Sequence, residues 1–407
     1  MEMTEAAAKS QASVVTITPF VHFVPFADGG VLFRPGGRRL WVLNAPSAFI
    51  WCLLDPGDNL EGLASRVAAR FAIDQTTALR DVTLTLEAFT KEGLFSAAEV
   101  EPATVDQPFV WLEADSRAPA GPGGWAVTTL FQAPGQVVEF LCQDLLAGAE
   151  FARLVSHLGV AGQSPVTTRL AVAATSPAAD SWDILVNGSL LVTGALRNEI
   201  VPQLMTILFI RSSELLADKL LFHAAALGRG ERAILFPAET GGGKTTLAAA
   251  LATQGYLFYS DELAAVDRSD LRLCPVALPM SIKPGSVPVL EEYYPGLTDY
   301  PVHLRADGQL VRYLPPPDGS SAGSDRPGAP IEAIIFPRYR PATAGVELLA
   351  MAKSSALQTL CQAGSSDRPL EVADVEAMIA LVEGCRCYTL EYADLQGAID
   401  RLATIFP

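Results

Sequence analysis

The sequence predicts a mixed α/β protein in which a small α+β unit precedes a larger α/β domain. Three observations predict this: the apolar pattern changes from extended to helical between residues 14 and 95, residues 101–124 are rich in Pro, Ala, Gly and Asp, and residues 233–253 are typical of a strand, a glycine-rich loop and a helix. We expect a first domain at 14–96, a linker at 97–125 and a second domain at 126–407, with a scaffold portion at 126–200 and the core at 200–407.

Composition limits the class of protein. Half of the 407 residues are hydrophobic and 18% are charged, which suits a folded chain and excludes wholesale disorder. The 45 acidic and 29 basic residues give a net charge of -16, so we expect no nucleic-acid partner. The six cysteines form neither a zinc motif nor a disulfide framework. Apolar runs such as 204–210 are too short to span a membrane, and the first residues lack a signal peptide, so we expect a cytoplasmic protein without a membrane partner.

Local patterns predict the elements of the N-terminal unit. Two β-like runs, at 31–33 and 40–43, are separated by the turn residues Pro35-Gly36-Gly37. Three helices are expected to follow. Asn44 is a plausible cap of the first helix, in which Pro46 follows it, and Gly93 ends the third. Their apolar residues at helical spacing are Phe49, Ile50 and Leu53 in the first helix, Leu60, Leu63 and Val67 in the second, and Leu79, Val82, Leu86 and Phe89 in the third.

The elements of the second domain follow from the same rules. Asn187-Gly188 is typical of a type I′ hairpin turn, and Asp307-Gly308 indicates a second hairpin. The other expected elements are a strand near 137–142, helices near 145–158 and at 200–217, strands at 220–227, 233–237, 256–260 and 331–337, and a flexible segment at 315–330.

The strongest chemical motif is the run from Ala238 to Thr246, between an apolar strand and an Ala/Leu-rich helix. Glycines allow close approach of phosphates, and a helix N-terminus binds anions. We therefore expect ATP and Mg²⁺ as cofactors, with Lys244 on the β- and γ-phosphates and the Thr245 hydroxyl on the metal. Ala238 stands where the Walker A pattern has its first glycine. Under the ATP hypothesis, the nucleotide-binding residues are Glu239, Thr240, Gly241, Gly242, Gly243, Lys244, Thr245 and Thr246. The alternative hypothesis is a glycine-rich turn that binds no ligand.

Two carboxylates follow the next strand. Asp261 and Glu262 end an apolar run, where one carboxylate could hold Mg²⁺ and another could take a hydroxyl proton. His223 lies on the expected 220–227 strand, which precedes the strand leading into the glycine-rich loop, and could face the γ-phosphate. The alternatives are a solvated strand end for the acids and a buried structural histidine for His223. Lys283, Arg312, Arg338 and Arg340 are cations beside apolar strand residues and are candidates for phosphate or substrate, although each could be a surface cation.

The order of His223, a Walker-like loop and Asp261-Glu262 resembles the HPr serine kinase/phosphorylase family over residues 200–270. The resemblance implies the P-loop kinase fold shared with phosphoenolpyruvate carboxykinase. It also implies catalytic roles for His223, Lys244, Asp261 and Glu262, and Mg²⁺ binding by Thr245, Asp261 and Glu262. Glu262 replaces the second Asp of the family, and the family's Glu-Arg-Gly-containing signature is missing. HPr as substrate and reverse phosphorolysis are therefore not expected.

The N-terminal unit resembles PqqD, a small winged-helix-like domain, over residues 19–95. The residues that carry the likeness are the 31–33 and 40–43 runs and the helix entry Leu43-Asn44-Ala45-Pro46-Ser47-Ala48. PqqD-like domains recognise the leaders of ribosomally made, modified precursor peptides as an added strand. The resemblance implies a leader groove between the 39–43 strand and the 79–89 helix, with Arg39, Leu40, Trp41, Val42, Leu79, Val82 and Leu86 as contacts. The alternative is a purely structural or dimerisation module.

The combined motifs favour a leader-guided peptide kinase that transfers the γ-phosphoryl group of ATP to a Ser or Thr hydroxyl of a bound precursor. Tethering by the leader raises the effective substrate concentration. Two other hypotheses stay open: a kinase of a small free hydroxyl compound, and a nucleotide-gated peptide chaperone without transfer. The sequence leaves open the peptide, the acceptor, the nucleotide preference, homo-oligomerisation, and whether Asp261 or Glu262 is the base.

Overall fold

The computed structural model describes residues 21–54, 59–95, 124–160, 164–176, 180–239, 241–323, 326–342, 345–364 and 368–406. They form two compact units. The first unit consists of the described residues of Met1–Asp106, Ala352–Cys361 and Asp367–Glu383, and the second of those of Gln107–Met351, Gln362–Ser366 and Gly384–Pro407. Thr240, residues 14–20 and the expected linker up to residue 123 lie outside the described residues.

The first unit is built on a three-stranded antiparallel sheet in the order β1-β2-β3. Both predicted strands are confirmed, and a third precedes them: β1 (His22–Phe26), β2 (Gly29–Phe33) and β3 (Leu40–Asn44). The sequence pattern missed β1 because Pro25 interrupts it, and proline is tolerated only where a strand has an unpaired side. Here β1 pairs with β2 alone among the described strands, so the sheet has edge strands on both sides.

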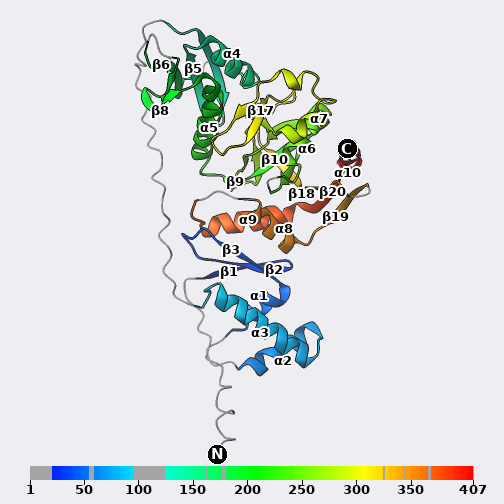
Figure 1. Cartoon of the computed structure of the whole chain (residues 1–407). Coiled ribbons are helices and arrows are strands. Elements are labelled where there is room, and N and C mark those ends of the chain that lie inside the picture. The colour runs from blue at the N-terminus through cyan, green and yellow to red at the C-terminus, as the bar shows by residue number, and fades with distance from the viewer. Residues whose placement is uncertain are drawn as a thin grey trace, which may run out of the picture. The chain divides into compact units, whose positions relative to one another are not determined.

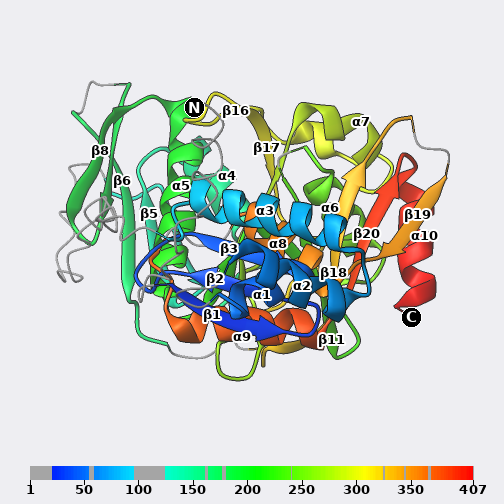
Figure 2. The same ribbon diagram turned by 90° about the horizontal axis from the view of Figure 1, so that it is seen from below.

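The three predicted helices are present, and in the structure they cover one face of this sheet (Figure 2). They are α1 (Ala45–Cys52), α2 (Leu60–Phe71) and α3 (Gln75–Lys91). The Asn44 side chain accepts a hydrogen bond from the Ser47 backbone N–H at 3.0 Å, which caps α1. Gly93, in the left-handed region at φ 70°, follows the end of α3. Leu32 and Leu43 from the sheet share one core with Trp51, Val67 and Phe89 from the helices.

The opposite face of the sheet is covered by two helices from far along the chain, α8 (Lys353–Gln362) and α9 (Val372–Gly384) (Figure 1). Val31 and Phe33 alternate with Leu32 and are 0% exposed, so they are buried on this second face. The Ser354 backbone N–H donates to Asp28 Oδ1 at 3.0 Å. Leu370 exchanges two backbone hydrogen bonds with the 36–37 turn. The first unit is therefore a sheet between two helical layers, of which one comes from residues 352–383.

The second unit begins with a five-stranded sheet in the order β4-β5-β6-β7-β8. The Asn187-Gly188 hairpin is confirmed: both residues have positive φ, at 50° and 83°, which a type I′ turn requires. Helix α4 is shorter than the predicted 145–158 helix. The elements are β4 (Val127–Ala133), β5 (Gln136–Cys142), α4 (Leu145–Leu154), β6 (Thr168–Ala174), β7 (Trp182–Val186), β8 (Ser189–Ala195) and α5 (Arg197–Leu215).

The main sheet of the second unit has nine strands, with β12-β10-β11-β18-β14-β13-β9 as its path and β20 pairing with β18 and β19. Helix α6 (Lys244–Thr253) follows β11, and its residues 247–252 are all buried. The strands are β9 (Leu220–Phe222), β10 (Ala224–Arg229), β11 (Arg232–Pro237), β12 (Leu257–Ser260), β13 (Ala264–Val266), β14 (Arg272–Cys274), β18 (Ala329–Tyr339), β19 (Val346–Ala350) and β20 (Arg386–Tyr392), with α10 (Leu395–Ile405) at the end.

One predicted strand is wrong: the 220–227 run is not continuous. It breaks at His223 into β9, which pairs with β13, and β10, which pairs with β11 and β12. The His223 backbone N–H donates to the Gly364 carbonyl at 2.9 Å instead of entering the ladder. An apolar run carries no mark of this break, because the change of partner depends on strands that follow much later in the chain.

A small sheet in the order β15-β17-β16 completes the second unit. Its strands are β15 (Met280–Ile282), β16 (His303–Leu304) and β17 (Leu310–Leu314). The predicted hairpin at Asp307-Gly308 is confirmed, since it joins β16 to β17. Between β15 and β16 lie the short turns η1 (Pro284–Ser286), α7 (Val287–Leu290) and η2 (Leu297–Asp299). Across the described helices, none has the length and apolar character to cross a bilayer.

Candidate active site

The glycine-rich loop connects β11 to α6 through backbone that only glycine adopts without strain. Gly241 has φ 91°, and Gly243, the residue before α6, has φ 86°. The Gly242 N–H donates to the Glu239 carbonyl at 3.1 Å, which closes the loop. The predicted strand, loop and helix are thus present, and the loop ends at the N-terminus of a buried helix where free N–H groups favour an anion.

Two tyrosines fix the loop from the neighbouring strands. The Tyr392 hydroxyl donates to the Gly243 carbonyl at 3.3 Å, and the Tyr339 N–H donates to the Gly242 carbonyl at 3.2 Å. A Cβ atom added to Gly243 would lie 2.5 Å from the Tyr392 hydroxyl oxygen, whereas one added to Gly241 would meet open space. The ends of β18 and β20 therefore determine how tightly the loop folds.

These contacts predict different costs for two similar substitutions. Gly241→Ala should cost about 1 to 2 kcal/mol, because alanine is strained at positive φ. Gly243→Ala adds a steric clash, so it should cost about 2 to 5 kcal/mol and displace the loop. Thermal unfolding and ATP affinity, measured side by side on both variants, test this. Equal losses in the two variants would contradict the role given to Tyr392.

Lys244 is the first residue of α6 and is 7% exposed. Its Nζ has no hydrogen-bond partner among the described residues. Burial lowers the pKa of Lys244, and the nearby charges of Asp261 and Glu262 act in the opposite direction. A buried ammonium group without a hydrogen bond is costly. Its presence at the base of a phosphate-type loop is explained if an anion completes the site.

Asp261 follows β12 and is the second buried charge of the site. It is 4% exposed, and neither carboxylate oxygen has a hydrogen-bond partner among the described residues. Burial raises the pKa of Asp261 to about 6, and the nearby charge of Glu262 also raises it. Lys244 lowers this pKa, and so do the Thr245 side chain and the Ser281 N–H, although neither of these two groups reaches hydrogen-bond geometry. The adjacent Glu262 side chain is 33% exposed.

His223 lies in the bend between β9 and β10 and is exposed. Burial of part of its ring lowers the pKa of His223, and the cations Lys244, Lys283 and Arg305 lower it as well, whereas Glu262 raises it. These interactions place the imidazole in the electrostatic field of the loop lysine. His223 is therefore neutral around pH 7 and could accept or share a proton there.

The four cations predicted from the sequence have different surroundings. Lys283 directly follows β15 and interacts electrostatically with Lys244 and His223. The turn after it is held to α6 by a 2.7 Å hydrogen bond between the Thr246 and Ser286 hydroxyls. The other three have partners of their own: Arg312 donates to the Tyr300 carbonyl, and Arg338 and Arg340 lie 3.7 and 3.5 Å from Glu391.

Sequence reasoning missed Arg305. Its NH1 lies 3.4 Å from Glu262 Oε1 and its NH2 lies 3.3 Å from Asp307 Oδ2. It stands at the start of the turn between β16 and β17, and its N–H donates to the Gln309 carbonyl at 2.9 Å. The Asp307-Gly308 turn signal was visible in the sequence, but nothing local indicates that the residues beside this turn reach Glu262, two residues after β12.

The described residues suit a magnesium nucleotide rather than a closed metal site. No cluster of His, Cys, Asp and Glu that could hold a metal by itself occurs among the residues that the structure describes. Mg²⁺ bound with a nucleotide needs only one or two carboxylates, because phosphates and waters supply its other ligands. Thr245, Asp261 and Glu262 offer such oxygens, and the unpartnered Lys244 ammonium fits a phosphate.

The leader-type residues predicted in the first unit lie on β3 and α3. Strand β3 pairs only with β2 among the described strands, so one of its edges has unpaired backbone groups. The Trp41 indole N–H donates to Glu92 Oε2 at 3.0 Å, and Arg39 lies 3.4 Å from the same oxygen. Leu40, Val42, Leu79 and Leu86 are partly exposed. Val82, by contrast, is 0% exposed and belongs to the core.

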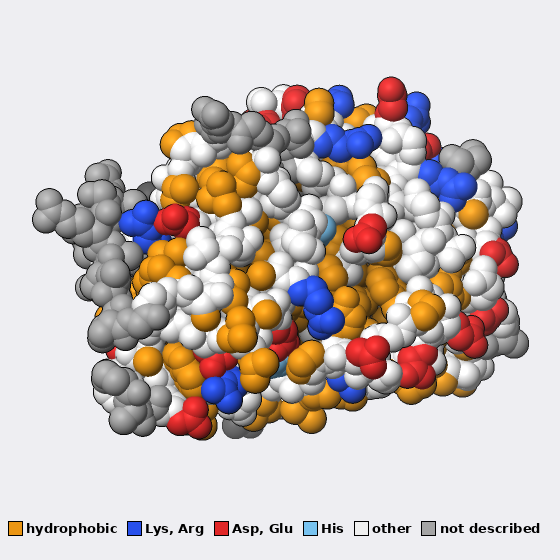
Figure 3. All heavy atoms as spheres, turned by 90° about the horizontal axis from the view of Figure 1, so that it is seen from above, with side chains coloured by type: hydrophobic (Ala, Val, Ile, Leu, Met, Phe, Trp, Pro, Cys, Tyr) orange, Lys and Arg blue, Asp and Glu red, His pale blue; other side chains and the backbone are white. Residues whose placement is uncertain are grey.

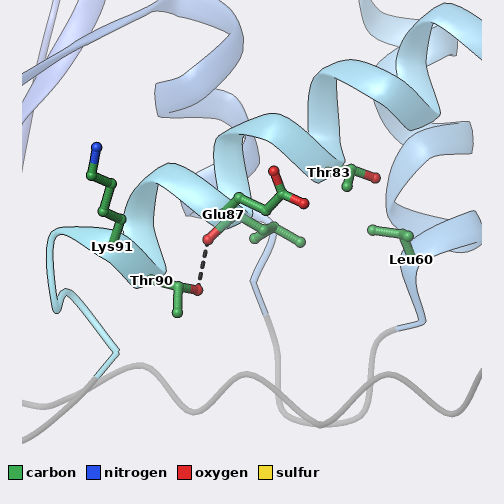
Figure 4. A pocket seen from close by; sticks show the side chains of 6 residues that line it. Leu60, Thr83, Glu87, Thr90 and Lys91 are labelled. Carbon is green, nitrogen blue, oxygen red and sulfur yellow. Dashed lines mark hydrogen bonds between the residues drawn. The ribbon is translucent and has the colours of Figure 1, made fainter. Parts of the chain in front are cut away.

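A shallow depression of about 400 Å³ lies along the outer side of α3 (Figure 4). Leu60 faces α3 across it, and Leu86 lies among the α3 residues that line it. The Thr90 hydroxyl, also in this depression, donates to the Leu86 carbonyl at 2.7 Å. The depression is lined by residues of α2 and α3 and by none of β3, so it is not the predicted groove between the 39–43 strand and the 79–89 helix. The full lining is Leu60, Thr83, Leu86, Glu87, Thr90 and Lys91.

Charges on the surface are mixed. On the face drawn in Figure 3, lysine and arginine side chains are scattered among acidic and hydrophobic ones and form no continuous basic strip. The cations that gather around Lys244 are thus a local feature of the site within a chain of net charge -16.

Comparison with known proteins identifies the first unit. Residues 29–94 match the family model described as "Coenzyme PQQ synthesis protein D (PqqD)". The N-terminal unit contains a PqqD domain. The match covers β2, β3 and the three helices, and so includes the unpaired edge of β3 and the α3 residues that were predicted as leader contacts.

Solved structures similar to this chain include a protein in complex with a leader peptide and a kinase/phosphatase. "TbiB1 in Complex with the TbiA(beta) Leader Peptide" is 25% identical and covers 20% of this chain and 96% of its own, with a TM-score of 0.19. "Structure of the Hpr(Ser) kinase/phosphatase from Coxiella burnetii" is 10% identical and covers 46% of this chain and 96% of its own, with a TM-score of 0.23. At such TM-scores neither likeness fixes the role of a residue. The comparison with curated proteins found no match.

Proposed function

We propose that this protein is an ATP-dependent kinase of ribosomally made peptides, which binds a precursor through its leader and phosphorylates a Ser or Thr hydroxyl. One observation carries the proposal: a buried, unpartnered lysine at a phosphate-type loop lies in the electrostatic field of a buried, unpartnered aspartate, in a chain that also has a PqqD domain. The lysine suits the phosphates of a nucleotide, and the aspartate suits the hydroxyl group that accepts the phosphoryl group. The PqqD domain suits a precursor peptide as the substrate that carries this hydroxyl.

The residues of the site account for each step of transfer. Lys244 and the loop N–H groups bind the β- and γ-phosphates, and Thr245, Asp261 and Glu262 would hold a magnesium ion, which would supply positive charge to the phosphates. Asp261 accepts the proton of the attacking hydroxyl. The hydroxyl oxygen then forms a bond to the γ-phosphorus as the bond to the β,γ-bridging oxygen breaks, and ADP leaves. Lys283 and His223 stand beside the charge that develops on the transferred group.

Leader capture by β3 follows from its unpaired edge. An extended peptide added to β3 gains backbone hydrogen bonds, and the partly exposed Leu79 and Leu86 of α3 offer apolar contacts. Binding through the leader raises the local concentration of the acceptor residue at the active site. The active site can therefore bind the acceptor residue itself weakly and still phosphorylate it. Val82 supports this surface from within the core and does not contact the peptide.

Intact mass of a candidate precursor, chosen from short reading frames next to this gene, tests the function. Incubation with ATP and Mg²⁺ should add one phosphoryl group to the peptide. Phosphorylation of free sugars or amino acids, with no effect of the peptide, would favour a small-molecule kinase instead. Peptide binding that ATP alters, with no change in mass, would favour a nucleotide-gated chaperone.

The leader surface predicts a contrast between two leucines of α3. Leu86→Ala should weaken leader affinity about tenfold, because the substitution removes apolar contact at the proposed groove. Leu84→Ala, on the same helix at a position that is 56% exposed, should leave affinity within twofold of the original. Fluorescence anisotropy of a labelled leader measures both. Equal losses would place the peptide elsewhere.

A further inference from the structure

The small sheet brings two cations to one of its edges. Strands β15 and β16 are each antiparallel to β17, so they run parallel to each other. Lys283 directly follows β15 and Arg305 directly follows β16. Because the carboxyl ends of parallel strands lie at the same edge of a sheet, both cations extend from the same side. Lys283 and Arg305 each lower the pKa of His223, so this edge faces the site.

Arg305 is held at this edge by two carboxylates. Glu262, which directly follows Asp261, and Asp307 of its own turn lie on either side of the guanidinium. The Arg305 and Glu262 side chains are only 30% and 33% exposed. The pair is therefore partly shielded from water, unlike an exposed ion pair of little energetic value.

The hairpin that carries Arg305 is anchored to the five-stranded part of the unit. His303 is buried, and its Nε2 lies 2.7 Å from Glu150 Oε1 on α4. Arg153, also on α4, lies over the Tyr300 ring at 4.1 Å. These contacts flank the chain entering β16, directly before Arg305. The scaffold portion of the domain thus fixes where the Arg305 backbone lies.

We propose that Arg305 is a positioning residue for Glu262, holding that carboxylate beside Asp261 so that it contributes to binding of the magnesium nucleotide. The inference rests on the proposed function and adds a residue to its site. It also gives the 126–200 scaffold a role, because α4 anchors the hairpin from which Arg305 reaches Glu262.

A double-mutant cycle tests whether Arg305 acts through Glu262. Arg305→Ala should weaken binding of a non-hydrolysable ATP analogue at saturating Mg²⁺ about tenfold or more, as loss of a group that orients a metal ligand does. Binding in EDTA should change less than twofold. In a Glu262→Gln background, Arg305→Ala should add no further loss. Isothermal titration calorimetry measures all of these without requiring turnover.

Two more variants complete the design. Arg305→Lys should recover part of the affinity, because an ammonium group retains the charge without the bidentate fork. Asp307→Asn, which removes the other carboxylate that holds Arg305, should weaken binding less than Arg305→Ala does, because the Glu262 contact remains. Tighter magnesium-nucleotide binding by Arg305→Ala would overturn the proposal and make Arg305 a competitor of the metal. A further loss of fivefold or more in the Glu262→Gln background would overturn it too.

The outcomes separate this proposal from the proposed function. If the original protein binds the magnesium nucleotide but transfers no phosphoryl group, the kinase function fails and the binding cycle still decides the role of Arg305. If the original protein binds no nucleotide under either condition, both proposals are overturned.

Discussion

Replacing Lys244 with Met should reduce phosphoryl transfer at least about 10³-fold, the largest effect that we expect of any single substitution, because Lys244 is the buried cation at the start of α6 that contacts the β- and γ-phosphates, a contact that Lys283 does not replace. Transfer of labelled γ-phosphate to the precursor measures it. Leader affinity should not change, since Lys244 belongs to the second unit and the leader surface to the first.

Lys219→Met provides the matched control for Lys244. The Lys219 Nζ already has partners, Asp267 at 2.7 Å and Asp218 at 2.9 Å, so it has no role in phosphate binding. The control should retain transfer and lose some stability. If Lys244→Met retains more than a tenth of the original transfer rate, the nucleotide does not bind at the glycine-rich loop.

Replacing Asp261 with Asn should lower transfer about 10²- to 10⁴-fold and, at the same time, stabilise the protein at neutral pH. The loss of rate follows from removing the proton acceptor. The gain follows from burial: the pKa of Asp261 is raised to about 6 in the folded protein from 3.8 when exposed, so ionisation opposes folding. The original protein therefore loses stability as the pH rises from about 4 through 6, and the variant does not.

Thermal midpoints at several pH values check this sign. Asp261→Asn should melt a few degrees (~2 to 6 °C) above the original at pH 7.5, with the difference vanishing near pH 4. Asp267→Asn is the control of opposite sign, because the hydrogen bond from Lys219 lowers the pKa of Asp267 and its charge stabilises the fold. A lower midpoint for Asp261→Asn at pH 7.5 would contradict the buried, unpartnered carboxylate.

Local signals in the sequence predicted much of the fold. The glycines before Lys244, the Asn44 cap and the Asn187-Gly188 turn each determine the backbone within a few residues, and all three were correctly predicted. The same holds for the apolar spacing of α3. Such elements are readable because the interactions that fix them are close in sequence.

The features that were not predicted depend on contacts between distant segments. The break at His223 is set by Gly364, and Arg305 meets Glu262 only because β16 and β12 end near one site. Helices α8 and α9 belong to the unit of the PqqD domain, although they lie far along the chain. The hydrophobic pattern within a short window of residues does not show which distant segments come into contact.

The layer formed by α8 and α9 also affects how leader dependence should be tested. Deleting residues 1–100 would remove the sheet whose Val31 and Phe33 are buried on the side of these helices. The deletion would expose apolar surface and could lower activity through misfolding alone. Changes to the substrate, which leave the protein intact, are therefore the better test.

The measurement that tests leader-guided phosphorylation most directly compares the whole precursor with its leader and core supplied as separate peptides, at equal concentrations below micromolar. The account predicts that the whole precursor gains one phosphoryl group at least about tenfold faster, because the tether raises the local concentration of the acceptor, and that added free leader inhibits this reaction. Equal rates for the linked and separate peptides, with no inhibition by free leader, would contradict the account.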